Sequence, residues 1–395
     1  MHMNIRTAKT IQERREALEK ETGSSLHHSG HYSLDDMVAS TRNCENMIGV
    51  TQIPLGIAGP LLMHNAECIM QNYYIPLATT EGALVASVSR GCKVITQSGG
   101  VVVEVEDVGA TRGPVFRVET IAEGQKLETF LFDHFDEIKN VAASTSHHLT
   151  LKTYMVSGVG KYRFVRFVFD TGEAMGLNMV TIATTAIAEY IYKTIGIQCV
   201  DISGNFCVDK KPSWLNFIHK RGKAVRAEVT IPSSLVTTVL KTTPQAIYDA
   251  WLSKCMYGSL MSGSLGFNAQ YANVVAALFL ATGQDPAHIV EGSMGVTTTE
   301  VCEKPVTRYT QHKNSDLYVS VYLPDLMVGT IGGGTGLATQ REALTLLGLK
   351  PGEEKSARTL AGIIGGAVLA GEISLLASLA EGSLAHAHEK LARGK

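Results

Sequence analysis

The segment from Ile202 to Pro212 places three charged side chains at the end of an apolar run. Asp209, Lys210 and Lys211 follow one another directly, and Pro212 ends the segment. Two ammonium groups at one point suit the binding of an anion and the stabilisation of negative charge that develops on an oxygen. A solvated turn before the proline explains the same residues without any chemistry, and the segment alone favours that plainer interpretation.

Glu81, Asp285 and His388 are further titratable residues, and each also has a structural explanation. Glu81 opens a predicted helix over 81–96, where an acid complements the helix dipole. Asp285 precedes Pro286, which is the arrangement of an N-cap followed by proline in the first helical position. His388 lies near the end of a predicted C-terminal helix, where a histidine commonly interacts with the dipole. Each residue alone is therefore a weak signal.

The middle of the chain contains the elements that must position these residues. Its predicted order is β-α-β-β-α-β, which is the ferredoxin-like arrangement. The strands are expected at 114–121, 149–156, 162–169 and 197–202, and the helices at 123–141 and 174–195. This order predicts an α+β fold in which a compact module is inserted into a larger, helix-rich domain, after a surface helix over 4–22.

The composition excludes several classes of protein. A chain of 395 residues suffices for two or three domains, and a net charge of -2 offers no basic field for nucleic acid or an anionic membrane. Seven cysteines without a C-x-x-C pair argue against disulfides and structural zinc. No apolar signal sequence opens the chain, and the apolar segment 359–380 contains Glu372, so we predict a buried core helix there. We expect a cytoplasmic protein without a metal.

Taken together, several segments are similar in order and spacing to the hydroxymethylglutaryl-CoA (HMG-CoA) reductase family. The resemblance runs from about Glu45 to the C-terminus, and its detail resembles the class I branch without that branch's membrane anchor. The matching segments are Glu45-Asn-Met-Ile-Gly49, Ala78-Thr-Thr-Glu-Gly82, Thr111-Arg-Gly-Pro114, Gly172-Glu-Ala-Met-Gly-Leu-Asn178, Ser203-Gly-Asn-Phe-Cys-Val-Asp-Lys-Lys-Pro212, Gly283-Gln-Asp-Pro286 and Gly329-Thr-Ile-Gly-Gly-Gly-Thr335. The resemblance implies an N-terminal helical segment over 1–36, a large substrate and dimerisation domain over 37–113 and 203–395, and a dinucleotide-binding domain over 114–202.

The resemblance also implies a reaction and four catalytic residues. The family reduces a thioester twice with two nicotinamide cofactors, which gives mevalonate and free coenzyme A. Lys210 would stabilise the oxyanion, and Glu81 would supply a proton to the aldehyde, a role for which burial would favour its protonated form. Asp285 would lie between Glu81 and Lys210, and His388 would protonate the departing thiolate.

The resemblance assigns binding residues in two groups, and it implies active sites that lie across the interface of a homodimer or a dimer of dimers. The substrate HMG-CoA would contact Arg112, Ser203, Asp209, Lys211, Lys254 and Asn273, with Ser87 and Arg90 at its coenzyme A part. NADPH would contact Ser146, His147, Glu173, Met175, Gly176, Asn178 and Arg393.

Four positions depart from the family's pattern. Glu173 replaces the usual Asp, Gln270 replaces a usual His, and Gly336 replaces a larger polar or basic residue. His147 replaces the arginine that holds the 2′-phosphate of NADPH, and a neutral histidine cannot bind phosphate bidentately. We therefore expect NADPH as the cofactor, with NADH as its rival.

Two alternatives to a biosynthetic reductase remain open from the sequence. The same fold could run oxidatively and degrade mevalonate with NAD, and His147 favours that interpretation. A non-catalytic paralogue that binds acyl-CoA is a second alternative, which Gln270 and Glu173 keep open although all four catalytic residue types are present. Turnover of HMG-CoA with NADPH or NADH distinguishes the three.

Overall fold

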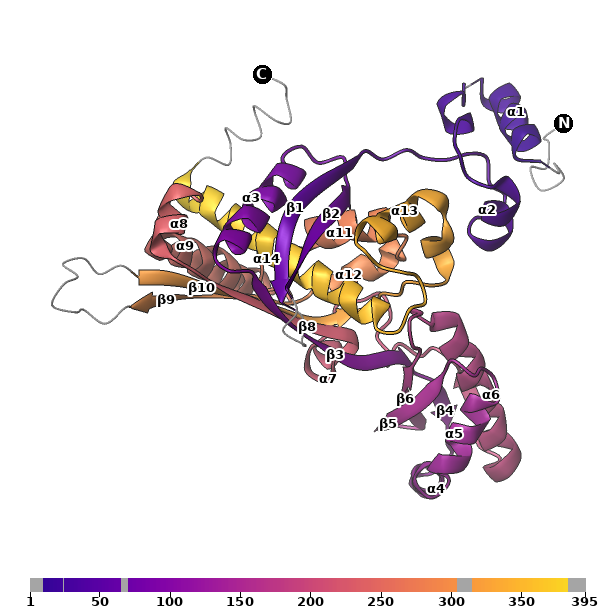
Figure 1. The fold of residues 1–395 in the computed structure, drawn as a ribbon. Helices are drawn as coiled ribbons and strands as arrows, with labels where there is room; N and C mark the ends of the chain where they lie inside the picture. Colours follow the sequence, from indigo (N-terminus) through magenta and orange to yellow (C-terminus); the bar gives the residue numbers. More distant parts are fainter. Residues whose placement is uncertain (1–9, 24, 65–69, 304–314, 383–395) are drawn as a thin grey trace.

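Strand β3 (Val101–Arg112) belongs to both parts of a ten-stranded sheet (Figure 1). The computed structural model describes residues 10–23, 25–64, 70–303 and 315–382. Most of β3 pairs with β8 (Arg221–Ile231), and its last three residues pair with β6 (Tyr162–Asp170). The register shifts at Gly109, whose φ of 119° and close approach to the Phe169 carbonyl suit a glycine. One strand thus connects the two halves of the molecule.

The chain between residues 115 and 201 has the predicted β-α-β-β-α-β order, with strands in the order β7-β4-β6-β5 and every pair antiparallel. We call it the small module. Its elements are β4 (Val115–Arg117), α4 (Ile121–Asp133), α5 (Phe135–Ala143), β5 (Thr150–Val159), β6, α6 (Leu177–Ile195) and β7 (Cys199–Asp201).

Several predicted bounds in the small module are wrong by two or three residues, such as the start of α6, predicted at 174 and found at Leu177. Two larger differences have a clear cause. The first strand ends at Arg117 because Thr120 already caps α4, accepting a hydrogen bond from the Glu123 N–H at 3.1 Å. The predicted single helix is two helices, because His134 leaves the helical conformation and both ends α4 and precedes α5. The α+β class and the order of elements are confirmed.

The larger part of the sheet carries most of the helices. Its remaining strands are β1 (Leu55–His64), β2 (Met70–Ala78), β9 (Val296–Glu303) and β10 (Ser315–Leu326). The helices are α3 (Leu84–Gln97), α7 (Trp214–His219), α8 (Ser233–Thr238), α9 (Pro244–Trp251), the π-helix η3 (Leu252–Gly258), α10 (Ser259–Ser262), α11 (Tyr271–Thr282), η4 (Pro286–His288), α12 (Ile289–Gly292), η5 (Gly333–Gly336), α13 (Ala338–Leu346) and α14 (Ser356–Glu381).

Helix α14 is the core of this part. It is long and apolar enough to cross a membrane, yet 94% of its apolar window is buried inside the protein, as the sequence predicts for 359–380. It lies against α3, α9 and α11 on one side and the sheet on the other (Figure 1). Gly91 of α3 permits this packing, because a Cβ there would lie 1.9 Å from the Ala370 carbonyl oxygen.

The N-terminal helices stand apart from the sheet (Figure 1). Helix α1 (Ile11–Thr22) begins with a capping box from Thr10 and ends at Gly23 with a φ of 69°, so the described part of the predicted surface helix is confirmed. Helix α2 (Asp36–Arg42) and the short η2 (His28–Gly30) follow.

Candidate active site

The charged segment after β7 forms a loop in which three non-glycine residues have positive φ. These are Asn205, Val208 and Lys210, at 64°, 51° and 58°. A left-handed conformation is unfavourable for a β-branched residue such as Val208, and such conformations cluster at functional sites. The Lys210 N–H donates to Glu291 Oε1 at 3.2 Å, which ties the loop to α12.

Lys210 and Asp285 form the central ion pair of this region, with Nζ and Oδ2 at 3.0 Å. Asp285 is also the predicted cap, because Oδ1 accepts a hydrogen bond from the Ala287 N–H at 3.0 Å. Partial burial would raise the pKa of Asp285, but the hydrogen bonds from Lys210 and the Ala287 N–H outweigh it and lower the pKa. Asp285 is therefore a stable anion. Its predicted role as a cap is confirmed, and its catalytic role stays a prediction.

Glu81 differs from the prediction in two ways. Helix α3 begins at Leu84, so Glu81 lies in the preceding turn, where its N–H donates to Thr79 Oγ1 at 3.0 Å. Its carboxylate is exposed in the single chain rather than buried. It accepts a hydrogen bond from the Asn273 amide at 3.4 Å, and the described residues include no ion pair that joins it to Lys210 or Asp285. The predicted Glu81–Asp285–Lys210 network is thus present as two separate pairs.

A cavity of about 860 Å³ is lined by two residues predicted to bind the substrate and by one that departs from the family's pattern. Lys254, Gln270 and Asn273 line it, with Pro212 from the end of the charged loop. Lys254 lies on the π-helix η3, and π-helical turns occur frequently at functional sites. The cavity thus borders both the Lys210 loop and the residue that contacts Glu81.

Gln270 is held by a buried acid on α14. Glu372 is fully buried and accepts hydrogen bonds from the N–H groups of Ala269 and Gln270 at 2.8 and 2.6 Å. Burial raises the pKa of Glu372, although these hydrogen bonds and one from Thr297 oppose the shift. The Gln270 side chain donates to the Gly371 carbonyl at 2.6 Å. An amide suits this contact, so Gln270 has a structural role at the wall of the cavity.

Behind the charged loop lies a buried cluster centred on Arg221, which sequence reasoning missed. Its guanidinium is fully buried and donates at 2.9 Å to Asp209, Glu291 and the Thr111 hydroxyl. Asp325 lies 3.6 Å away. Burial would lower the pKa of Arg221, but the three carboxylates more than compensate and raise it. Arg221 thus stays charged and holds Asp209 in place.

Asp325 and His288 complete this cluster. Burial raises the pKa of Asp325 to about 6 although Arg221 opposes the shift. His288 is buried, and its Nδ1 lies 2.5 Å from Glu291 Oε1. The one sequence signal for this cluster was the spacing after Asp285, since His288 and Glu291 follow it at three and six residues. Arg221 and Asp325 lie at strand ends, and nothing in their local sequence marked them.

Asp209, His288 and Glu291 place potential metal-ligand atoms within 4.8 Å of one another. The donor set does not favour a metal ion, because the Arg221 guanidinium already donates to both carboxylates at 2.9 Å. The positive charge that a metal would supply is thus provided by a side chain.

Arg112 connects the charged loop to the small module. Its guanidinium donates to Ser203 Oγ at 3.1 Å and lies 3.8 Å from Asp209 Oδ2. It also reaches the Leu177 carbonyl at 3.4 Å, in the first turn of α6. Three residues predicted for substrate binding therefore meet, and they meet beside the segment predicted to bind the cofactor. Lys211 points back along the loop and donates to the Asp209 carbonyl at 3.3 Å.

The start of α6 gathers most of the predicted cofactor residues. Gly176 precedes the helix with a φ of 81°, and Asn178 is exposed in the first turn. The hydroxyl of Ser146 lies 3.7 Å from the Met179 sulfur, so the loop after α5 lies beside this helix end. His147 is exposed in that loop. A helix N-terminus with exposed polar neighbours suits a pyrophosphate, and the residues present fit a dinucleotide.

Two other predicted residues, Met175 and Glu173, pack against the large part. The Met175 backbone lies close to Gly329, because a Cβ added to Gly329 would be 2.5 Å from the Met175 backbone nitrogen. The Glu173 carboxylate accepts hydrogen bonds from the Lys355 and Ala357 N–H groups at 2.7 and 2.6 Å and from the Ser356 hydroxyl at 3.0 Å. Glu173 thus caps α14, and its predicted contact with a cofactor stays a prediction.

Ser87 and Arg90 lie on α3 and contact the far end of α14. Both donate to Ser374 Oγ at 3.0 Å, and Arg90 also reaches Ser378. These contacts place the predicted coenzyme A residues at α14 and not at the charged loop. Gly336 ends η5, and His388 and Arg393 lie outside the described residues.

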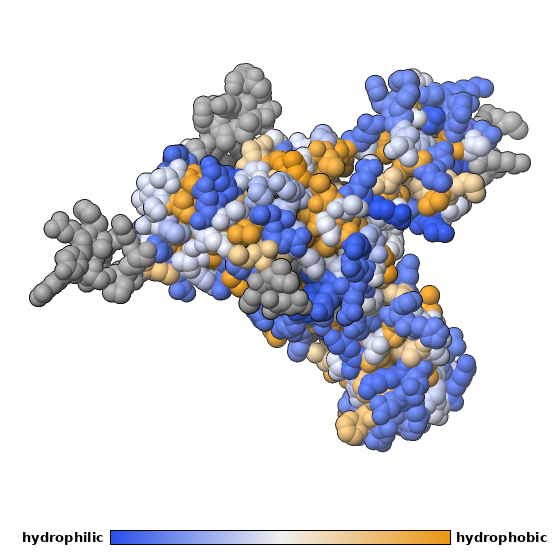
Figure 2. Space-filling view, viewed as in Figure 1, coloured by the Kyte–Doolittle hydropathy of each residue, from blue (hydrophilic) through white to orange (hydrophobic). Residues whose placement is uncertain are grey.

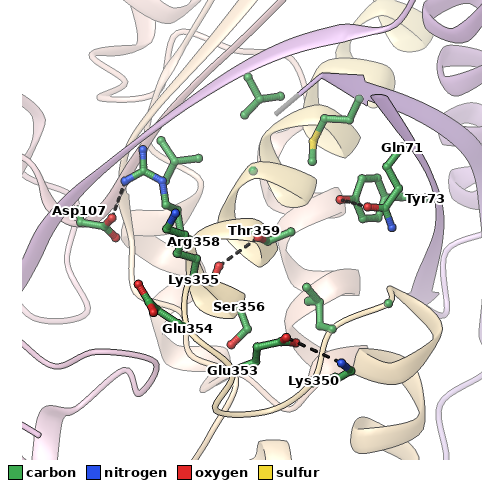
Figure 3. Close-up of a pocket in the computed structure, with 16 residues that line it drawn as sticks. Gln71, Tyr73, Asp107, Lys350, Glu353, Glu354, Lys355, Ser356, Arg358 and Thr359 are labelled. Atoms are coloured by element: carbon green, nitrogen blue, oxygen red, sulfur yellow. Dashed lines mark hydrogen bonds and ion pairs between the residues drawn. The ribbon is translucent and has the colours of Figure 1, made fainter. Parts of the chain in front are cut away.

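A second cavity of about 740 Å³ opens between the β1–β2 hairpin, β3 and the start of α14 (Figure 3). Arg358 pairs with Asp107 at 2.5 Å, and Lys350 lies 3.8 Å from Glu353. None of the predicted site residues that the structure describes lines this cavity. The candidate active site is therefore not this cavity but the region around the Lys210–Asp285 ion pair and the 860 Å³ cavity beside it.

Comparison with known proteins shows the family of this chain. The family model for hydroxymethylglutaryl-coenzyme A reductase matches residues 10–393. The 3-hydroxy-3-methylglutaryl-coenzyme A reductase of Methanothermobacter thermautotrophicus is 48% identical over 382 residues, which cover 96% of this chain and 93% of the relative. The corresponding protein of Pyrococcus abyssi is 46% identical over 385 residues, covering 96% and 92%. The Arabidopsis thaliana reductase 1 is 42% identical over 388 residues, covering 96% of this chain and 63% of the relative.

Among solved structures, a class II 3-hydroxy-3-methylglutaryl-CoA reductase from Streptococcus pneumoniae bound to NADPH aligns with a TM-score of 0.67. The alignment covers 95% of this chain and 99% of that chain at 20% identity, so it supports the fold. The chain therefore belongs to the hydroxymethylglutaryl-coenzyme A reductase family and is an oxidoreductase that reduces HMG-CoA to mevalonate and free coenzyme A.

Proposed function

We propose that Lys210 is the cation that stabilises the oxyanion formed when hydride adds to the thioester carbonyl. The observation that carries this proposal is the 3.0 Å ion pair between Lys210 Nζ and Asp285. The pair is partly exposed, with 41% of the lysine and 37% of the aspartate side chain accessible, so a substrate oxygen can reach the ammonium group. A preorganised cation at the reacting oxygen lowers the barrier without reorganisation during the reaction.

Glu81 supplies the proton that converts the aldehyde to the alcohol, and Asn273 orients its carboxyl group through their hydrogen bond. Such an acid works best where water is excluded, whereas Glu81 is exposed in the single chain. A second copy of the chain would supply that cover. His388 protonates the departing thiolate, as the family resemblance implies.

Substrate binding uses the residues around the 860 Å³ cavity and the Arg112 cluster. Lys254 and Asn273 line the cavity, whereas Arg112 and Ser203 contact each other between the charged loop and the start of α6. Asp209 and Lys211 complete the polar surface for the hydroxymethylglutaryl part. Ser87 and Arg90 hold coenzyme A at the end of α14.

The small module, with boundaries at 114 and 202, is the dinucleotide-binding domain between the two stretches 37–113 and 203–395 of the large domain. When bound, the nicotinamide dinucleotide supplies the hydride for each of the two reductions. Met175, Gly176 and Asn178 would hold it at the start of α6, with Ser146, His147 and Arg393 toward the adenosine end. Arg112 lies between this helix end and the charged loop, which supports a hydride donor and acceptor that meet there.

Self-association is the second part of the proposal. The β1–β2 hairpin exposes Leu55, Ile57 and Tyr74 by 55%, 48% and 52%, and apolar residues gather on this surface in Figure 2. The end of β2 leads directly to Glu81. A dimer that covered this surface would bury apolar area and the catalytic acid together. Light scattering of the purified chain tests this, and a monomer with full activity contradicts it.

The class and location follow as finer proposals. A class I-like enzyme is supported by the detail of the Asp209-Lys210-Lys211 segment and of the glycine run at 332–336, which resembles that branch. The described cysteines are free, which agrees with a reducing, cytoplasmic location.

The experiment that tests the function is a cofactor assay with HMG-CoA. We expect oxidation of two equivalents of NADPH per mevalonate formed, with NADH as the weaker donor. Preferential reduction of NAD with mevalonate and coenzyme A would favour the oxidative alternative, for which His147 is the supporting residue. Absence of turnover with either cofactor would contradict both enzymatic proposals.

A further inference from the structure

His288 is a buried histidine that faces three carboxylates of the candidate active site. Its Nδ1 lies 2.5 Å from Glu291 Oε1. Its Nε2 lies 3.6 Å from Asp285 Oδ2 and 3.7 Å from Asp209 Oδ1. Nε2 is fully buried and has no hydrogen-bond partner among the described residues. The ring therefore lies directly behind the carboxylate that holds Lys210.

The hydrogen-bonding capacity of imidazole limits the states this arrangement allows. A neutral ring carries one N–H and one lone pair, and carboxylates only accept hydrogen bonds. If Nδ1 donates to Glu291, a neutral ring would direct the lone pair of Nε2 at two anionic oxygens, which is repulsive. With a hydrogen on both nitrogens, each side of the ring faces an opposite charge instead.

The acids and cations of the whole cluster balance before the ring is counted. Four acids, namely Asp209, Asp285, Glu291 and Asp325, belong to this cluster, against the cations Lys210 and Arg221. Arg112 adds a third cation at 3.8 Å from Asp209. The buried Arg166 adds a fourth cation, linked to Asp325 through Asn216, so the four acids already face four cations. What favours the second ring hydrogen is local, because Nε2 faces the Asp285 and Asp209 oxygens at 3.6 and 3.7 Å.

We propose that His288 is a positioning residue that, as a buried imidazolium, anchors the Asp285 carboxylate so that it holds Lys210 at the reacting oxygen. Glu291 fixes the ring from the opposite side and also accepts the Lys210 backbone N–H at 3.2 Å. One histidine–glutamate pair thus sets both ends of the Lys210–Asp285 contact, the backbone through Glu291 and the carboxylate through His288. This inference rests on the proposed roles of Lys210 and Asp285.

The first test compares His288→Leu and His288→Gln in the full-length enzyme. We expect His288→Leu to lower kcat by on the order of tenfold to a hundredfold, because a small misplacement of a catalytic group has effects of that size. KM for HMG-CoA should change little. His288→Gln should recover part of kcat, because its amide can still donate to Asp285. Equal activity of His288→Leu and the wild type overturns the inference.

His134→Gln is the matched control, since His134 also pairs with an acid three residues later. Its Nδ1 lies 3.0 Å from Glu137, but both side chains are exposed on the small module. We expect unchanged kcat. An equal loss in this variant would show that the effect at His288 is not specific to the buried ring, and would overturn the inference.

A direct readout of the ring keeps the inference testable if His288→Leu fails to fold. Nitrogen-15 NMR of histidine-labelled wild-type enzyme, with the signal assigned from its loss in His288→Gln, should show both ring nitrogens protonated near neutral pH. A neutral tautomer signature there overturns the inference. Lys210→Ala separates this outcome from the function itself, because its full activity would contradict the role of Lys210 whatever the state of His288.

Discussion

The charged loop and the cofactor-binding end of α6 differ in what holds their polar residues in place. Behind the loop, the fully buried Arg221 donates to three oxygens, and the contacts of Asp209, Glu291 and Lys210 all lead back to this cluster. At α6, by contrast, His147 and Asn178 are exposed. Lys210 and Asp285 are thus fixed by several contacts, whereas the exposed Glu81 has a single hydrogen bond from Asn273. The residues assigned to the choice of dinucleotide are free to change without affecting the core.

The largest expected effect is on stability, in Arg221→Met. Removing one partner of a buried ion cluster leaves unpaired charges and typically costs about 3–5 kcal/mol. Chemical denaturation should show this loss in the free energy of unfolding. Arg226→Met on the same strand is the control, because Arg226 forms a surface pair with Glu104 at 2.9 Å and should cost less than about 1 kcal/mol. Equal stability of the two variants would break the comparison.

Lys210→Ala should abolish most activity without loss of stability. Removing a group that stabilises an oxyanion lowers kcat by about a hundredfold to a thousandfold. Lys211→Ala, one residue along the loop, should instead raise KM for HMG-CoA. Steady-state kinetics of both variants measure this difference, and equal kcat values in the two would contradict the assignment of distinct roles.

Asp325 gives the buried cluster a predictable pH dependence. The pKa of Asp325 is about 6 in the folded chain, against the ordinary value of 3.8 for an aspartate. The folded state therefore binds this proton more tightly than the unfolded chain does. The contribution of Asp325 to stability is therefore complete below the unfolded pKa and is lost as the pH rises through the folded pKa.

Asp325→Asn removes this dependence. Relative to the wild type, the free energy of unfolding of the variant should rise by on the order of 2 kcal/mol between about pH 4 and pH 7. Denaturation at several pH values measures it. A constant difference between the two proteins would show that Asp325 does not titrate in this range.

Glu173→Ala tests the contact that joins the small module to α14. Loss of a capping side chain typically costs about 1–2 kcal/mol of stability. Thermal unfolding and KM for the dinucleotide should both change, since the same loop leads into α6. Glu353→Ala near the start of α14 is the control, because its pairing with Lys350 is exposed. A change in KM alone would indicate a direct cofactor contact in place of the cap.

His147→Arg should have the smallest effect, and it should concern specificity alone. A guanidinium binds phosphate bidentately, so we expect the preference for NADPH over NADH to rise about tenfold, with unchanged stability. His148→Arg next to it is the matched control for added charge. If both variants shift the preference for NADPH over NADH equally, the cause is the added positive charge in general and not a direct contact with the 2′-phosphate.

The sequence predicted this molecule best where residues close in the chain act together. The order of the small module and the cap at Asp285 depend on neighbouring residues, and both are confirmed. Arg221 and Asp325 lie 104 positions apart at the ends of two strands, and only the pairing of β8 with β10 brings them together. Glu173 was assigned from its motif, whereas its partners at the start of α14 lie more than 180 residues away.

The two contacts at the ends of helix α14 fix the number of residues between them. Between Ala357, capped by Glu173, and Ser378, bound by Arg90, the helix spans roughly 32 Å at 1.5 Å per residue. One inserted residue would rotate every later side chain by about 100° and move Ser378 away from Arg90. Loops elsewhere can lengthen by single residues, but this helix cannot. Relatives that keep both contacts should therefore keep the number of residues between them, whatever the side chains in between.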